Sequence, residues 1–400
     1  MVRSKMLAMV AGFAALTGAP LAPGQVARLG MMGDSLTDEY AEDTFNYATN
    51  WSMQLAQYRS VWMGLTAAAA GAPGGTWGEP RRTWFESNWA RYGDDSTTCQ
   101  TDGQVSGLAS QVGPGWSNGV THVFIEIGTN DFSPNSSAFL NIYFGFWSQA
   151  QITSYVNTCL ANIETIVSTL DNTGAAILLG NYVDFSVVPA TRSFYGNAAS
   201  RNKVAAVVTR VNTGIETIAH NHRVVLVDLN KMGSNILGTN TALKQFLTIG
   251  NVQIQLFNRD TTTHTNPLAG FVDDGAHPHT TLQGVFANLV MSALNQGWGA
   301  HYTLFTDSEI LDHAGIAYGG ADTLDSQVGP YSQYIRSYRC PGDTNRDGAI
   351  NSIDLGTLLA HFGEATGPGL PSAAADFNHD GVIDTLDLGS LLAAFGSACP

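Results

Sequence analysis

Strand-like and helix-like segments alternate along the first 300 residues, and this alternation restricts the possible folds more than any other feature of the chain. Apolar, strand-like runs lie at 26–32, 120–127, 175–183 and 223–229. Helical patterns are predicted at 51–58, 151–170, 200–220 and 282–294. Strands that alternate with helices favour a parallel sheet covered by helices on both faces. We therefore expect an α/β fold, in the form of a three-layer α/β/α sandwich.

The composition allows a large core and argues against nucleic acid as a partner. The chain has 400 residues, of which 44% are hydrophobic and 13% charged, a length and balance that favour two folded domains. The net charge of -15 would repel a phosphate backbone. The acidity is concentrated in residues 340–400, which hold eight Asp and Glu against one Arg.

The N-terminus is typical of an export signal. Arg3 and Lys5 precede an apolar stretch, 6–17, that is too short to span a bilayer. We expect residues 1–24 to be a cleaved signal peptide of bacterial type; the alternative is an N-terminal membrane anchor. No later segment is apolar for long enough to cross a bilayer, so we expect no transmembrane anchor after cleavage and a secreted or cell-surface protein.

Polar residues suited to nucleophilic catalysis follow the predicted strands. Ser35 comes after the first strand and Asn130 after the second, while Asp274 and His277 lie near the end of the α/β region. The carboxyl ends of parallel strands meet at one rim of a sheet, where ligands bind. A serine, a histidine and a carboxylate at this rim predict acyl transfer to the serine. The alternative is that Ser35 only forms a turn or caps a helix.

The blocks GDSLT, GTND and DGAHP, in this order, resemble those of the GDSL or SGNH hydrolase family. The resemblance covers roughly residues 25–300 and implies a flavodoxin-like parallel sheet. It implies Ser35 as the nucleophile, His277 as its base and Asp274 as the partner of the histidine. It further implies three oxyanion donors: the backbone N–H groups of Ser35 and of a glycine, and the amide of Asn130.

The segment NWARYGDDS resembles the glycine block of that family and implies Gly93 as the donor, with Gly107 in VSGLAS as the alternative. The chain departs from the family pattern in a long insertion, rich in Trp, Gly and Pro, between Ser35 and Gly93. Ser35 lies in G-x-S-x-T and not in G-x-S-x-G, so the nucleophile elbow of the α/β-hydrolases is absent.

A repeat of 33 residues marks a second domain, which we expect at 340–400. Segments 342–363 and 375–396 each begin with D-x-N-x-D-G and continue into an amphipathic helix. The spacing of oxygen ligands is that of a calcium loop. The predicted ligands are Asp343, Asn345, Asp347, Asn351 and Asp354 in the first copy, and Asp376, Asn378, Asp380, Asp384 and Asp387 in the second.

Each loop ends in Asp where an EF-hand usually has Glu, and only one helix follows it, so the repeat resembles a type I dockerin module. The resemblance implies two structural calcium ions and a cohesin-type scaffold partner. The pairs expected to select the partner, Ser352–Ile353 and Thr385–Leu386, differ from the common Ser–Thr pair. The alternative is a calcium-stabilised cap or surface-attachment module.

Two further expectations concern the cysteines and the segment between the domains. Cys340 and Cys399 bracket the acidic segment and are the natural disulfide pair, which leaves Cys99–Cys159 by elimination. Residues 301–339 show no clear periodicity, and we expect a linker or a partly ordered extension.

The sequence thus predicts a secreted serine ester hydrolase that needs no cofactor for catalysis. Its expected substrate is an acetylated polysaccharide, an inference from the dockerin-like module and not from any residue. A lipase or an esterase for small acyl esters is the alternative among enzymes. The alternative from another class is a non-catalytic surface or scaffold protein on a hydrolase fold.

Overall fold

The computed structural model describes residues 28–399 apart from 43, 113–118, 262–263 and 368–369. The signal peptide expected at 1–24 lies outside the described residues. Within them, no helix combines the length and apolar character needed to cross a membrane.

A five-stranded sheet forms the centre of the larger part of the molecule. Its order is β1 (Leu29–Gly33), β2 (His122–Glu126), β3 (Ala176–Gly180), β4 (Val225–Val227), β10 (Ile335–Ser337). The first four strands are parallel, and each overlaps a strand predicted from the sequence. β10 pairs antiparallel with β4 and closes that edge.

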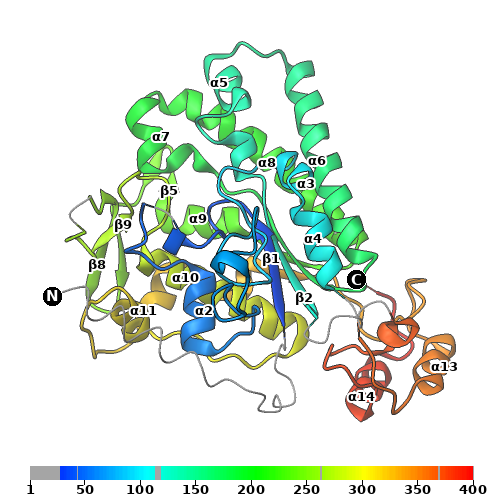
Figure 1. Ribbon diagram of the computed structural model, residues 1–400. Coiled ribbons are helices and arrows are strands. Elements are labelled where there is room, and N and C mark those ends of the chain that lie inside the picture. The colour runs from blue at the N-terminus through cyan, green and yellow to red at the C-terminus, as the bar shows by residue number, and fades with distance from the viewer. Residues whose placement is uncertain (1–27, 43, 113–118, 262–263, 368–369, 400) are drawn as a thin grey trace.

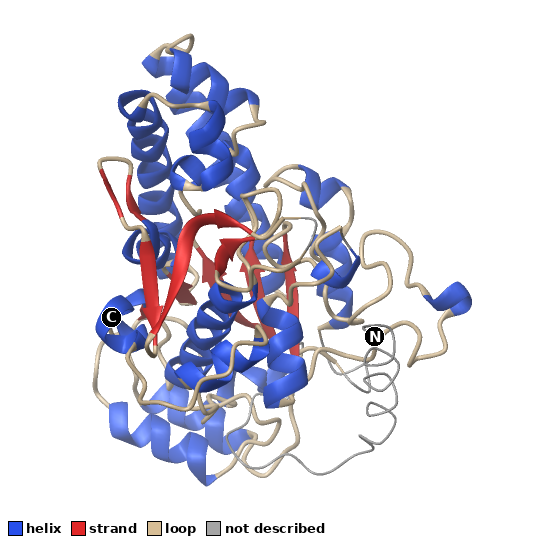
Figure 2. Cartoon of the chain, turned by 90° about the vertical axis from the view of Figure 1, so that its left-hand side faces the viewer, coloured by secondary structure: helices blue, strands red, loops and turns tan. Residues whose placement is uncertain are grey.

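Alternate side chains of the strands pack into two separate cores. Met31, Phe124 and Leu178 belong to one core and Met32, Ile125 and Leu179 to the other. The first core is covered by α2 (Trp51–Arg59), α9 (Leu229–Leu237), α10 (Thr280–Trp298) and α11 (Asp307–His313). The second is covered by α4 (Gln104–Gln111), α5 (Ser137–Phe144), α6 (Gln149–Asp171) and α8 (Ala198–Asn221). Figures 1 and 2 show these helices on either side of the strands, and the expected three-layer α/β class is confirmed.

The remaining elements are short and lie around this sandwich. A second sheet consists of β7 (Phe246–Ile249), β8 (Val252–Arg259) and β9 (Ala269–Phe271). A separate hairpin is formed by β5 (Gly238–Thr239) and β6 (Ala242–Leu243). The short helices are η2 (Tyr40–Glu42), η3 (Pro73–Gly75), α3 (Thr98–Thr101), η4 (Thr129–Phe132), η5 (Phe185–Val187), α7 (Pro189–Phe194), α12 (Leu324–Val328) and η6 (Tyr331–Tyr334).

The flavodoxin-like order places one more strand outside β1. Here residues 87–89 run parallel to β1 in that position, but they form a single bridge, between Asn88 and Met31. Met31 N donates to Ser87 O at 2.9 Å, and Trp89 N donates to Met31 O at 2.8 Å. The insertion before Gly93 therefore folds back along the edge of the sheet and delivers the glycine to the end of β1.

Residues 301–339 are more ordered than the linker or partly ordered extension expected for them. They form α11, α12, η6 and β10, and the side chains of Ile310, Leu311 and Tyr334 have no exposed surface. Asp228 N donates to Tyr334 O at 2.7 Å, which fixes this segment beside β4. The apolar residues are too irregularly spaced to show a period, yet they cover one end of the core.

The C-terminal part is a small all-α module with its own core, as expected. It contains α13 (Ser352–Ala360), η7 (Pro371–Ala375) and α14 (Thr385–Ala394). Leu358 and Leu391, equivalent in the two repeats, are fully buried between the helices. The disulfide expected between Cys340 and Cys399 is present, with an S–S distance of 2.06 Å.

The disulfide expected between Cys99 and Cys159 is wrong. Both are free thiols, buried in the core beneath α4, α6 and α8. Burial raises the pKa of both thiols, so they remain protonated and pack as small apolar side chains. The number of cysteines carries no information on where the folded chain places their sulfur atoms.

Candidate active site and calcium module

The structure brings Ser35, His277 and Asp274 into one hydrogen-bonded chain. His277 Nε2 lies 2.6 Å from Ser35 Oγ, although 242 positions separate the two residues. The other ring nitrogen, Nδ1, bonds to Asp274 Oδ2. Asp274 Oδ1 accepts from the backbone N–H groups of Ala276 at 2.8 Å and His277 at 3.0 Å, so the loop itself orients the carboxylate.

The charge of Asp274 is maintained despite its partial burial. Burial would raise the pKa of this carboxyl, but the hydrogen bond and the charge of His277 outweigh it and hold the pKa below its ordinary value. An ionised Asp274 accepts from Nδ1–H and leaves Nε2 free to accept a proton from Ser35.

A tight turn after β1 exposes the serine. A Cβ atom on Gly33 would lie 2.2 Å from the Glu126 carbonyl oxygen, so only glycine allows this close approach to β2. Asp34 Oδ1 accepts from Leu36 N at 3.0 Å and stabilises the turn. Thr37 Oγ1 donates to Glu126 Oε2 at 3.0 Å and ties the turn to the neighbouring strand. Ser35 is partly exposed at the carboxyl end of β1.

Asn130 and Gly93 lie at the same rim. Asn130, in η4 after β2, donates from Nδ2 to Asp94 O at 2.9 Å, which links the loops of the two predicted donors. Gly93 is exposed and has a φ of +85°, a conformation that favours glycine. Among residues 28–399 as described, neither Gly93 N nor Ser35 N donates a hydrogen bond to the protein.

Gly107, the alternative to Gly93, has no free backbone N–H group that could bind an oxyanion. It belongs to α4, where its N–H donates to Gly103 O at 2.9 Å. A Cβ atom at this position would lie 2.0 Å from the Trp89 ring, so its glycine serves close packing.

Three residues that the sequence did not single out hold the site together. Gln104 Oε1 accepts from Gly33 N at 2.9 Å, while its Nε2 donates to Asp94 Oδ2 at 2.6 Å. Asp38 Oδ2 accepts from Tyr92 N at 2.8 Å, which fixes the residue before Gly93. The Phe45 ring stacks on the His277 ring, with centroids 4.9 Å apart and 23° between the planes. An aromatic residue soon after the serine block was the only available signal for Phe45.

Three buried carboxyls surround the catalytic loops. Burial raises the pKa of Asp34 to about 7, and of Asp94 and Asp131 to about 6. Asp131 is held by the Tyr182 hydroxyl, which donates to Oδ2 at 2.9 Å. Asp34 Oδ2 has no hydrogen-bond partner within the described residues.

We therefore expect these three carboxyls to contribute stability that rises as the pH falls from 8 toward 5. Four histidines whose pKa burial lowers contribute in the opposite direction, namely His122, His279, His313 and His379. Each carboxyl with a raised pKa binds its proton more tightly in the folded chain than in the unfolded chain, where its pKa is near 3.8. The stabilisation is present below the folded pKa values and is lost as the pH rises through them. The difference in Tm between the native chain and Asp34→Asn, measured at fixed calcium over this range, tests the contribution of Asp34 and should shift in favour of the native chain as the pH falls. A Tm difference that stays constant from pH 8 to 5 would contradict the expectation.

The aromatic segment at 132–147 contributes mainly to the core. Phe139 and Tyr143 are buried in α5, and Trp147 packs against the same cluster. Phe144 and Phe146 are exposed and stacked, with centroids 5.6 Å apart.

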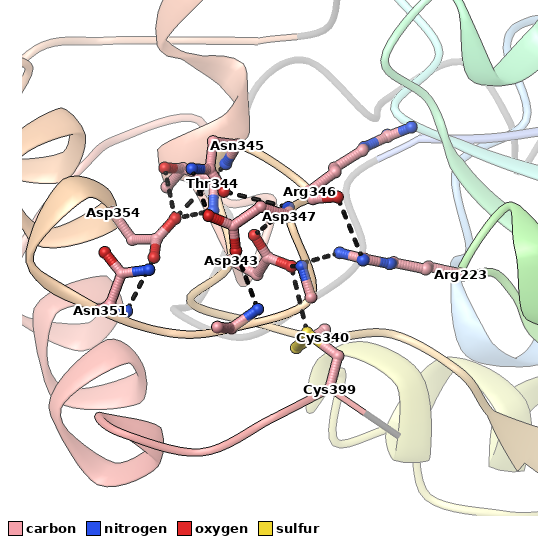
Figure 3. The surroundings of a disulfide bond; sticks show 12 residues. Arg223, Cys340, Asp343, Thr344, Asn345, Arg346, Asp347, Asn351, Asp354 and Cys399 are labelled. Atoms are coloured by element: carbon pink, nitrogen blue, oxygen red, sulfur yellow. Dashed lines mark hydrogen bonds and ion pairs between the residues drawn. A yellow bond between two sulfur atoms is a disulfide. The ribbon is translucent and has the colours of Figure 1, made fainter.

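The two predicted calcium loops have the same internal hydrogen bonds. Asp343 accepts from Asp347 N at 3.1 Å and from Gly348 N at 2.9 Å. The equivalent Asp376 accepts from Asp380 N at 3.2 Å and Gly381 N at 3.0 Å. Figure 3 shows how the side chains of the first loop converge.

The end of each loop also repeats. Asn351 caps α13, and Asn351 N donates to Asp354 Oδ2 at 2.8 Å. Asp384 caps α14 in the same way, with Asp384 N donating to Asp387 Oδ2 at 2.9 Å. The remaining predicted ligands, Asn345 and Asn378, donate from their amides to Asp347 and Asp380.

The residues present fit calcium. All predicted donors are carboxylate or amide oxygens, the ligands that calcium prefers, and Gly348 and Gly381 have the positive φ that the sharp turn requires. Burial, followed by the charges of Asp387 and Asp380, raises the pKa of Asp376 to about 7. Crowded carboxylates of this kind are relieved by a bound cation. The cluster of Cys340, Asp343 and Cys399 is not a separate metal site, because both cysteines are in the disulfide.

Two family models match the chain. The GDSL-like lipase/acylhydrolase family matches residues 31–280, and the type I dockerin domain matches residues 341–394. No curated protein shows significant similarity to the chain.

Similar solved structures include three hydrolases. A GDSL-like lipase from Bacteroides thetaiotaomicron has 14% identity and a TM-score of 0.36 over 72% of this chain and 97% of its own. An acetylxylan esterase from Geobacillus stearothermophilus has 13% identity and a TM-score of 0.39 over 68% and 96%. An extracellular lipase from Streptomyces rimosus has 14% identity and a TM-score of 0.34 over 63% and 92%. Likeness at this level says nothing about which ester this chain cleaves.

Proposed function

The chain belongs to the GDSL-like lipase/acylhydrolase family and carries a type I dockerin domain, and on this premise we propose that it hydrolyses carboxylic esters through an acyl-enzyme on Ser35. The observation that carries the proposal is the hydrogen-bonded chain from Ser35 Oγ through His277 to Asp274. Such a chain is the arrangement that activates a serine hydroxyl.

In the first half of the reaction, Ser35 Oγ attacks the ester carbonyl carbon while His277 Nε2 takes its proton. Asp274 stabilises the imidazolium that forms. The tetrahedral intermediate collapses, the C–O bond to the alcohol breaks, and His277 returns the proton to the leaving oxygen. A water molecule then loses a proton to His277 and attacks the acyl carbon. The bond between the acyl carbon and Ser35 Oγ breaks, His277 returns the proton to Oγ, and the acid is released.

The negative oxygen of each tetrahedral intermediate is stabilised by three donors. These are the backbone N–H groups of Ser35 and Gly93, which have no other partner among the described residues, and the second amide N–H of Asn130. The network of Gln104 and Asp38 fixes these donors before the substrate binds, so little reorganisation is needed in the transition state.

The substrate class that we favour is an acetylated polysaccharide. The dockerin domain supports this choice, because it implies assembly with a cohesin-type scaffold. The partly exposed Ser35 and the exposed Gly93 leave the site accessible to a polymer. A lipase or an esterase for small acyl esters is the second candidate, supported by the same triad. The triad itself argues against a purely non-catalytic binding protein.

An activity panel distinguishes these substrates. 4-Nitrophenyl acetate, butyrate and octanoate are compared with acetylated xylan, and released acetate is measured. Preference for acetyl esters together with acetate release from xylan supports the carbohydrate esterase. Preference for octanoate without acetate release supports the lipase, and inactivity on all four contradicts the proposed hydrolase.

We further propose that each loop binds one structural calcium ion and that the protein is secreted. We also propose that the module docks onto a cohesin-type partner. Calcium supplies charge neutralisation to the crowded carboxylates of the loops. The helices present equivalent exposed apolar residues in the two repeats, namely Ile353 and Leu386, Leu359 and Leu392. Exposed apolar patches of this kind mark interaction surfaces, which suits a cohesin-type partner.

We expect calorimetric titration of the full chain to give two calcium ions per molecule. Asp343→Ala and Asp376→Ala should each reduce the number to one, because each removes the first ligand of one loop. Asp325→Ala, outside the module, is the control and should leave two. A count of two in both loop variants would exclude the proposed ligand sets.

A further inference from the structure

The module is joined to the central sheet without a linker. β10 ends at Ser337, and Cys340 already belongs to the module through its disulfide. Between them, Tyr338 N still donates to Val224 O at 3.2 Å, at the start of β4. Only one residue, Arg339, therefore separates the hydrogen-bonded sheet from the cross-linked module.

The first calcium loop contacts the larger domain through two ion pairs, of which Figure 3 shows the one between Arg223 and Asp343. Arg223 Nη1 lies 2.5 Å from Asp343 Oδ2, the first predicted ligand, and its Nη2 donates to the Arg346 carbonyl at 3.3 Å. In return, Arg346 pairs with both oxygens of Asp171 at 3.0 Å. Asp171 ends α6 and Arg223 precedes β4, so both lie at the amino ends of the strands, opposite the triad.

In the second loop, the residue equivalent to Arg346 also lies against the larger domain. His379 lies 33 residues after Arg346, and both have positive φ, 59° and 57°. The His379 ring lies 5.6 Å from the ring of His122, the first residue of β2, and 6.3 Å from that of Trp298. Arg339 stacks over Trp298 at 4.8 Å and donates to Phe377 O at 2.6 Å.

These contacts are separate and do not form a continuous core. A crevice of about 580 Å³ remains between the two parts, lined by Ala176 and Val224 on one side and by Ala373 and Phe377 on the other. The module is thus held by side chains that project from its calcium loops, and their positions depend on the loop backbone.

We propose that the two calcium loops also form the surface by which the module docks onto the amino ends of the strands of its own catalytic domain, so that calcium binding and docking are linked. The inference rests on the calcium binding proposed above. Without the cation, the loop carboxylates repel one another and the turns that place Arg346 and His379 are lost. Figure 1 shows α13 and α14 at the periphery of the molecule, away from the central sheet.

Limited trypsin digestion of the full chain tests the link, because Arg339 and Arg346 are themselves cleavage sites within the interface. Cleavage after Arg339 is expected to be slow in calcium and fast after chelation with EGTA. If opening releases one ion, free calcium at a hundred times Kd slows the cleavage by about a hundredfold. Mass spectrometry identifies the cut, and calorimetry of the same sample counts bound calcium.

Substitutions in the catalytic domain distinguish a loss of docking from an unfolding of the module. Asp171→Asn and Arg223→Gln leave every predicted calcium ligand in place, so two ions should still bind. At saturating calcium both are expected to be cut after Arg339 at least about tenfold faster than the native chain. Arg210→Gln, on the exposed side of α8, is the matched control and should be as resistant as the native chain.

Two results overturn the proposal in distinguishable ways. If two calcium ions bind but cleavage is equally fast with and without calcium, or both interface variants remain resistant, the link is wrong and the calcium sites stand. If no calcium binds, the calcium sites and the link both fail.

Discussion

Ser35→Ala is expected to lower kcat on 4-nitrophenyl acetate by about 10⁶-fold, the loss typical of removing a triad serine. The variant keeps the turn after β1, because Asp34 and Thr37 stabilise it with their own hydrogen bonds. Circular dichroism and Tm should therefore be unchanged. Ser106→Ala, exposed in α4, is the matched control and should retain full activity.

The partners of Ser35 should give a graded series. His277→Ala is expected to match the loss of Ser35→Ala, since the two side chains act as one unit. Asp274→Asn should cost less, about 10⁴-fold, because it mainly disturbs the orientation and protonation of His277. A fluorophosphonate that labels the native chain at Ser35 confirms the nucleophile directly. More than a tenth of the native rate in folded Ser35→Ala would exclude the serine mechanism.

The parts of the fold predicted from the sequence are those with a local signal. The parallel strands are short runs of apolar residues that are buried on both faces, and the long helices show a clear apolar face. The strand β10 has no such signal: Ile335 is buried while Arg336 and Ser337 are exposed at the edge. Its place in the sheet depends on Val225–Val227, more than 100 positions earlier.

The candidate site likewise contains residues with a local sequence signal and residues without one. Ser35, Asn130, Asp274 and His277 lie in short motifs, and the structure brings them to one rim. Phe45 and Gln104 lie outside any motif, and their roles arise from contacts with His277 and Asp94 that only the folded chain creates. The two free cysteines illustrate the reverse, because an even number of cysteines suggested a second disulfide that the folded chain does not form.

The second large effect is expected at the oxyanion site. Asn130→Ala should lower kcat by about 10²–10³-fold and leave KM within about twofold, because the amide is proposed to bind charge that develops only in the transition state. Asn130 also bonds the Asp94 carbonyl, so a loss of stability must be measured separately. Asn157→Ala, an exposed residue of α6, is the control and should retain native kcat and Tm.

An inhibitor that mimics the tetrahedral intermediate decides the role of Asn130. A boronic acid forms an anionic adduct with Ser35, and its affinity should fall in Asn130→Ala by a factor similar to the fall in kcat. A purely structural asparagine gives another pattern: a lower Tm, a raised KM and an inhibitor affinity that does not follow kcat. Unchanged kcat and unchanged boronate affinity would remove Asn130 from the oxyanion site and leave the two backbone N–H groups of Ser35 and Gly93 as its donors.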